Sequence, residues 1–160
     1  MKGSAMHELS PGLAGVPAAK SSISFVNGQT GLLEYRGIGI EALAAHSSFL
    51  ETTFLLLYGE LPTQGKLAQF VGDVRLHRRI KYRITDLIKC LPEHGHPMDA
   101  LQAAVAALGM FYPARHVVDR QVQYWSTIRL IAKIPTIVAA YSRLRRGDEQ
   151  IQPRDDLDHA

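Results

Sequence analysis

The sequence predicts an all-α fold class, mainly helical, with one small β-hairpin near the N-terminus. From about residue 38 onward, apolar residues recur at three- and four-residue intervals, which is the spacing that gives a helix one apolar face. Strand-like alternation occurs only within residues 21–37, around Asn27-Gly28, a dipeptide typical of hairpin turns. With 160 residues, 46% of them hydrophobic, the chain is long enough for one domain with a sizeable core.

Three parts follow one another along the chain. We expect residues 1–20 to form a loose N-terminal arm, because they have neither a signal-peptide pattern nor any helical periodicity. We expect residues 21–37 to form a two-stranded hairpin that is the only sheet. Residues 38–160 are expected to form the helical body of the protein.

Helix-capping residues divide the first half of this body. A short helix is expected directly after Gly37. A second helix should begin after Ser47 or Ser48, with Glu51 near the capping-box position, and end at Gly59.

Prolines and glycines mark the later helices. The apolar spacing predicts helix from about residue 63 to Pro92, in two pieces with a break near residues 76–79. A helix over 97–112 has almost no polar face, so we expect it to be buried on most sides. A last helix should run from about Asp119 to Gly147, kinked or broken at Pro135, which lacks an amide hydrogen.

Several polar groups could carry chemistry, and each also has a structural interpretation. Glu93, His94 and His96 could be metal ligands, but they lack the spacing of zinc sites, and Pro97 suits the first turn of a helix. The single cysteine, Cys90, is interpreted as a small buried apolar residue.

Charged residues gather in two short segments. In the first, four arginines would share one helix face that could bind phosphates or simply be solvated: Arg75, Arg78, Arg79 and Arg83. In the second, residues 153–158 hold three carboxylates, which we interpret as a helix start with Asp155 or Asp156 as N-cap. The net charge of +3 is too small to indicate a nucleic-acid-binding tail.

Four motifs, taken in order, resemble the N-terminal portion of the citrate synthase family, with the details most similar to cyanobacterial members. They are SISFVNGQTGLLEYRG, GELPT, GHPMDALQ and PRDDLDHA, and the resemblance extends from about Pro11 to the last residue. It implies that residues 38–160 are the N-terminal helical part of the family's large domain, truncated at its C-terminal end. The family is mostly helical and forms homodimers.

The resemblance also implies a reaction: condensation of acetyl-CoA with oxaloacetate and water to give citrate and CoA in the tricarboxylic acid cycle, catalysed by an acyltransferase. The family's catalytic aspartate and histidines lie beyond the matched segment, around a His-Gly-Gly-Ala-Asn motif that this sequence lacks. No catalytic, cofactor-binding or metal-binding residue is therefore assigned, and His77, His94, His96 and His159 do not take those roles. We expect the chain alone to be inactive and poorly soluble, because apolar helix faces lack their partners.

Two alternatives stay open: part of a 2-methylcitrate synthase, which uses propionyl-CoA, or a non-catalytic dimerisation or regulatory module acting through basic residues 75–89. No bound cofactor is expected; acetyl-CoA and oxaloacetate would be substrates, and neither nucleic acid nor a membrane is an expected partner. A lone cysteine suits a reducing compartment, so we expect the protein in the cytoplasm.

Overall fold

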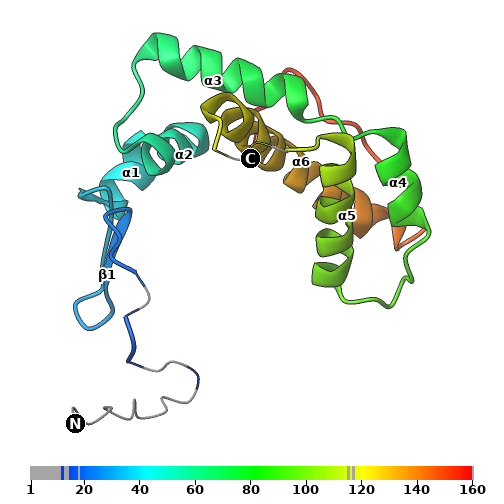
Figure 1. The fold of residues 1–160 in the computed structure, drawn as a ribbon, viewed down its shortest axis with the longest axis horizontal. Coiled ribbons are helices and arrows are strands. Elements are labelled where there is room, and N and C mark those ends of the chain that lie inside the picture. The colour runs from blue at the N-terminus through cyan, green and yellow to red at the C-terminus, as the bar shows by residue number, and fades with distance from the viewer. Residues whose placement is uncertain (1–11, 13–14, 18, 115, 117, 160) are drawn as a thin grey trace, which may run out of the picture.

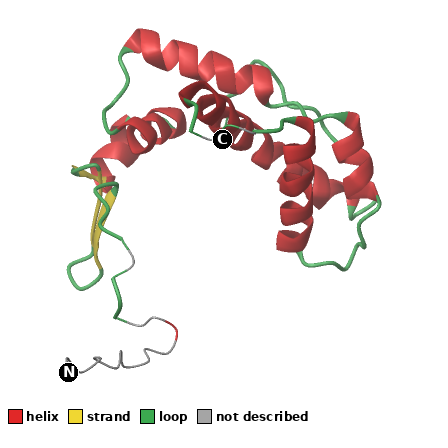
Figure 2. Ribbon diagram, in the orientation of Figure 1, coloured by secondary structure: helices red, strands yellow, loops and turns green. Residues whose placement is uncertain are grey.

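The computed structural model describes residues 12, 15–17, 19–114, 116 and 118–159. These residues form a three-stranded sheet followed by six helices. The helices build an arch, and the sheet projects from one end of it (Figures 1 and 2). The expected mainly helical class with a small N-terminal sheet is confirmed, whereas most of the arm expected at residues 1–20 lies outside the described residues.

The first two strands, β1 (Ser24–Asn27) and β2 (Leu32–Tyr35), pair antiparallel, with Asn27 opposite Leu32. The expected tight turn at Asn27-Gly28 is therefore wrong, since a four-residue loop joins the strands. The Asn27 side chain accepts hydrogen bonds from the backbone amides of Gln29 (3.1 Å) and Thr30 (3.3 Å). This Asx-type turn takes the place of the two-residue turn, and Gly31 supplies the left-handed residue (φ 69°).

The expected hairpin is confirmed as β1 and β2, but a third strand, β3 (Ile38–Gly39), adds to β2, so the sheet has three strands and not two. The reversal before β3 needs two consecutive left-handed residues, Arg36 (φ 51°) and Gly37 (φ 82°). Arginine is uncommon in that conformation, which is why the turn is not evident in the sequence. The Arg36 guanidinium donates to the Leu56 carbonyl (2.8 Å), and this contact ties the sheet to the helices.

The next two helices are α1 (Ile40–His46), which begins after β3 and not directly after Gly37, and α2 (Phe49–Tyr58), which follows its serine cap as predicted. Ser48 is the N-cap of α2. Its hydroxyl accepts from the Glu51 amide (3.2 Å), and the Glu51 carboxylate accepts from the Ser48 amide (2.7 Å). Gly59 ends α2 in a left-handed conformation, with its amide donating to the Leu55 carbonyl.

The predicted break in the basic segment is confirmed, since α3 (Gln64–His77) and α4 (Tyr82–Lys89) are separate helices. Helix α5 (Pro97–Phe111) matches its predicted range closely. Helix α6 (Arg120–Leu144) runs through Pro135 without a break. Proline removes one helical hydrogen bond, but α6 packs against α3, α4 and α5. These contacts stabilise it as one continuous helix.

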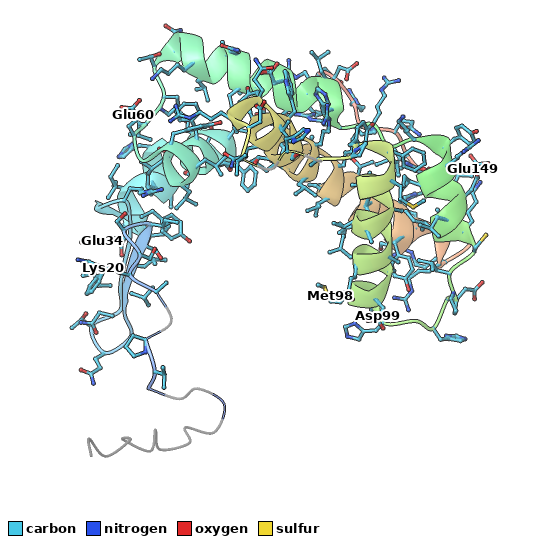
Figure 3. All side chains as sticks on the ribbon, in the orientation of Figure 1. Lys20, Glu34, Glu60, Met98, Asp99 and Glu149 are labelled. Carbon is cyan, nitrogen blue, oxygen red and sulfur yellow. The ribbon has the colours of Figure 1, made fainter. Side chains whose placement is uncertain are left out.

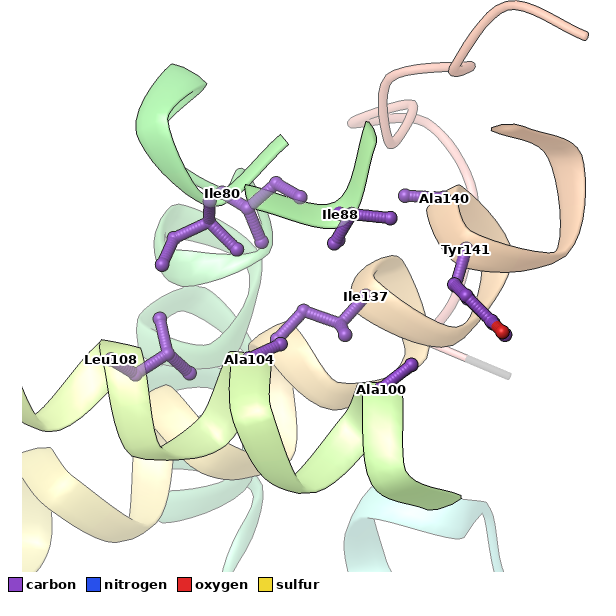
Figure 4. Packing of buried hydrophobic residues seen from close by; sticks show 9 residues of the cluster. Ile80, Ile88, Ala100, Ala104, Leu108, Ile137, Ala140 and Tyr141 are labelled. Atoms are coloured by element: carbon purple, nitrogen blue, oxygen red, sulfur yellow. The ribbon is translucent and has the colours of Figure 1, made fainter. Parts of the chain in front are cut away.

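Two apolar clusters form the core, and α6 contributes to both. The first joins α2, α3 and the N-terminal half of α6: Leu50, Phe54, Phe70, Val74, Ile128 and Ala132. The second joins α4, α5, the C-terminal half of α6 and one residue of the α3–α4 connection (Figure 4): Ile80, Ile84, Ile88, Ala100, Ala104, Leu108, Ile137, Ala140 and Tyr141. Because α6 lies in both clusters, it holds the two ends of the arch together.

Helix α5 is buried on one face only, so the expectation that it is buried on most sides is wrong for this chain. Ala100, Ala104 and Leu108 lie in the core, while Met98 is 60% exposed and Met110 85% exposed. Figure 3 shows Met98 on the side of α5 that faces away from α4. Part of the apolar surface of α5 is therefore not covered by any of the described residues.

Ala104→Leu tests the close approach of α5 and α6. Ala104 is fully buried, so three added carbon atoms must displace its neighbours in the second cluster, and we expect a loss of about 1–3 kcal/mol in the free energy of unfolding. The control is Ala106→Leu on the exposed side of the same helix, which should change stability by less than about 0.5 kcal/mol. Urea denaturation followed by circular dichroism measures both; equal effects would contradict close packing at Ala104.

Candidate functional site

A group of buried and partly buried polar contacts lies between the end of α3 and the start of α4. A helix end leaves backbone carbonyls without helical partners, and here two side chains of α6 satisfy them. The Lys133 ammonium donates to the carbonyls of His77 (2.7 Å) and Arg79 (2.6 Å), and the Thr136 hydroxyl donates to that of Arg78 (2.9 Å). Lys133 is only 3% exposed, so these bonds form in a largely dry environment. We call this group the α3–α6 junction.

Positive charge accumulates beside the junction, around the ring of Tyr112. The Arg129 guanidinium lies 4.7 Å from the ring centroid, the Lys81 ammonium 5.2 Å and the Lys133 ammonium 5.5 Å. The pKa of Lys133 is lowered to about 8, mainly because burial disfavours its charged form and to a smaller extent because Arg129 and Lys81 repel it. Tyr112 offers these cations the electron-rich face of its ring, and their summed field attracts anions.

The side chain of Arg78 extends from the junction to the last described segment. Its guanidinium donates to the carbonyls of Arg154 (3.2 Å) and Leu157 (2.7 Å), and the residue is only 5% exposed. Arg78 therefore binds backbone, and its charge is not presented to solvent.

The expectation of one basic helix face formed by Arg75, Arg78, Arg79 and Arg83 is wrong. The break between α3 and α4 turns Arg78 inward, while Arg79 is exposed with Asp155 at 3.7 Å. Arg83 lies on α4, where its Nε donates to the Tyr82 hydroxyl. A helical projection assumes a continuous helix, so it cannot describe residues on both sides of a break.

Cys90 is exposed, so its interpretation as a buried residue is wrong. Helix α4 buries Ile84 and Ile88, one helical turn apart, and Cys90 follows the last helical residue, Lys89. It therefore lies beyond the buried face of α4.

The cluster Glu93, His94 and His96 lies in the exposed loop before α5. His96 is the N-cap of that helix, and its Nδ1 accepts from the Met98 amide (3.2 Å), while Pro97 is the first helical residue. The prediction that this stretch begins a helix is confirmed. Within the described part of the chain, no three His, Cys, Asp or Glu side chains are grouped as metal ligands.

A turn lies at residues 155–157, and the described residues end at 159, so the helix start expected at Asp155 or Asp156 stays a prediction. The Arg154 guanidinium binds both carboxylate oxygens of Asp156, at 3.0 and 2.5 Å. This local pair leaves the Asp156 carboxylate facing Arg154 and not the backbone amides of a first helical turn.

These contacts define a helical scaffold whose buried polar side chains bind its own backbone. The family model for the C-terminal domain of citrate synthase matches residues 12–160. The chain belongs to the citrate synthase family.

Individual relatives agree with this family match. The chain is 56% identical over 149 residues to the citrate synthase of Synechocystis, covering 93% of this chain and 38% of the relative. It is 48% identical to that of Acidithiobacillus ferridurans, covering 94% and 40%. The solved citrate synthase of Pyrobaculum aerophilum superimposes with a TM-score of 0.87 at 37% identity, covering 94% and 40%. The chain thus spans about two-fifths of the length of these relatives.

Lys133→Met tests whether the α3–α6 junction stabilises the fold. Methionine keeps much of the side-chain volume but donates no hydrogen bond, so two buried carbonyls lose their partner, and we expect a loss of about 2 kcal/mol in the free energy of unfolding. The exposed Lys89→Met on α4 is the control and should stay within about 0.5 kcal/mol of the unmodified chain. Chemical denaturation at neutral pH measures both; a Lys133→Met chain as stable as the control would show that the junction is dispensable.

Proposed function

We propose that this chain is part of an enzyme that condenses acetyl-CoA with oxaloacetate and water to give citrate and CoA. The observation that carries the proposal is the family match over residues 12–160, supported by 56% identity to the Synechocystis citrate synthase. Because the chain spans about two-fifths of that relative, the activity is proposed for a whole protein of the relatives' length and not for these 160 residues alone.

The part proposed for this chain is structural. The reaction needs a base that removes a proton from the acetyl methyl group and donors that stabilise the enol and polarise the oxaloacetate carbonyl. None of these roles is assigned to a residue here. The chain would supply the arch of helices, with the α3–α6 junction fixing the positions of α3, α4 and α6 against which the catalytic part packs.

The two alternatives have less support. The relatives described above carry the name citrate synthase, which favours acetyl-CoA over propionyl-CoA. A regulatory module acting through a basic face at residues 75–89 is weakened because that face is divided, with Arg78 turned inward. We also propose that the protein is located in the cytoplasm. As a separate finding, no helix in the described ranges has the length and hydropathy to cross a membrane.

A chimera tests the proposed function directly. Residues 12–160 would replace the matching segment of the Synechocystis enzyme. We expect the chimera to release CoA from acetyl-CoA in the presence of oxaloacetate, at a rate within about tenfold of the parent, because a scaffold of this identity should preserve the catalytic geometry to within about 1.4 kcal/mol.

The controls are the parent enzyme, the 160-residue chain alone, which we expect to be inactive, and the chimera with propionyl-CoA. A chimera that folds with the parent's helix content but forms no citrate would contradict the proposal. Turnover by the chain alone would show that the catalytic groups lie within it.

We also infer that the whole protein forms a homodimer through α5 and α6. These helices border an open groove of about 280 Å³ whose lining is mostly apolar, including Met98, Leu101 and Val138. Exposed apolar surface of this kind is a common feature of protein interfaces. A second copy of the same two helices would cover it symmetrically.

Val138→Glu in the active chimera tests this interface. Placing a carboxylate in an apolar contact should raise the dissociation constant at least tenfold, which corresponds to about 1.4 kcal/mol. Leu76→Glu on α3, a more exposed apolar residue away from the groove, is the matched control and should leave association unchanged. Sedimentation velocity over a concentration series measures both; unchanged association of the Val138 variant would place the interface elsewhere.

A further inference from the structure

The last described segment, residues 149–159, turns back along α6 and is held mainly through its backbone. The Arg143 guanidinium donates to the Glu149 carbonyl (2.6 Å), and the Thr85 hydroxyl donates to the Gln150 side chain (2.8 Å). Farther along, Arg78 donates to the carbonyls of Arg154 and Leu157. The segment borders a groove of about 350 Å³ that Pro135 and Thr136 also line.

His159 lies at the far end of this segment. Its ring stacks on that of Phe49 in α2, with centroids 5.4 Å apart and planes inclined by 26°. Both ring nitrogens are buried, and neither has a hydrogen-bond partner within the described ranges. His159 therefore docks mainly as a flat, apolar ring between α2 and α6.

Pro135 explains why the ring can come close to α6. A proline has no amide hydrogen, so the Ile131 carbonyl, four residues earlier, lacks its helical partner. That carbonyl is near enough to the ring to raise the pKa of His159, although it does not meet hydrogen-bond geometry. Its effect is smaller than those of burial and of the Arg78 charge, which both lower the pKa.

Among the described residues, the groups around His159 offer its protonated ring nearby positive charge and no carboxylate that binds it. Arg78, from the end of α3, is the nearby cation, and Arg143 of α6 lines the same groove. Among the acids of residues 154–159, Asp155 faces Arg79 and Asp156 binds Arg154. Asp158 also lines the groove, but its side chain is exposed. Phe49, from α2, brings no charge.

We propose that His159 is the pH-sensitive end of a clasp: its neutral ring holds residues 154–159 against α2 and α6, and its protonation beside Arg78 releases them. The direction follows from linkage. The docked ring binds a proton less readily than the released ring, whose ordinary pKa is 6.5. Docking is thus fully favoured above about pH 6.5 and weakens as the pH falls through the lower pKa of the docked state.

Hydroxyl-radical footprinting read by mass spectrometry tests the clasp, because the segment is held through carbonyl and side-chain contacts. Side-chain oxidation in peptides covering 149–159 is compared between about pH 7.5 and about pH 5.5, with helix α3 as internal reference. We expect protection of this segment to fall at the lower pH, because the docking equilibrium constant decreases by up to about tenfold, the limit set over this range by a released pKa of 6.5. The whole chain is used throughout.

Two variants separate the clasp from general acid destabilisation. His159→Phe keeps a stacking ring but cannot be protonated, so its segment should be equally protected at both pH values. The exposed His46→Gln should retain the pH dependence of the unmodified chain. If the segment of His159→Phe loses protection at low pH as much as that of the unmodified chain, or if the unmodified chain shows no loss, the proposal is overturned.

Discussion

Three consecutive carbonyls at the end of α3 accept hydrogen bonds from two side chains of α6, and the position of every later element depends on this junction. The chain must turn at residues 78–81 so that α4 can pack on α5 and α6. A turn buried there would leave carbonyls without partners, at a cost of several kcal/mol. Lysine suits the position because its ammonium donates in more than one direction and its positive charge complements the negative end of a helix.

Helix α6 can serve both apolar clusters because the junction lies between them along its length. Ile128 and Ala132 face the first cluster, Ile137 and Ala140 face the second, and Lys133 and Thr136 occupy the stretch in between. The polar residues thus separate two dry regions without interrupting the helix. Pro135 falls in this stretch, where the lost helical hydrogen bond disturbs neither cluster.

The sequence predicted the features that depend on local chemistry and missed those that depend on tertiary contacts. The Ser48 cap, the break after α3 and the His96 helix start are encoded within a few residues, so their patterns identify them. The burial of Lys133 has no local signal, because its acceptors lie 54 and 56 residues away. As for function, the motifs identified the family, but none of them placed a catalytic group in this chain.

The junction recognises backbone and not side chains, and this has a consequence for sequence divergence. A carbonyl oxygen is present whatever residue carries it, so the exposed side chain of Arg79 can change without loss of the contact to Lys133. Positions 133 and 136, by contrast, must supply donors of the right reach. Within this one contact, substitutions should therefore accumulate at exposed Arg79, which accepts only through its carbonyl, and rarely at positions 133 and 136, which must donate.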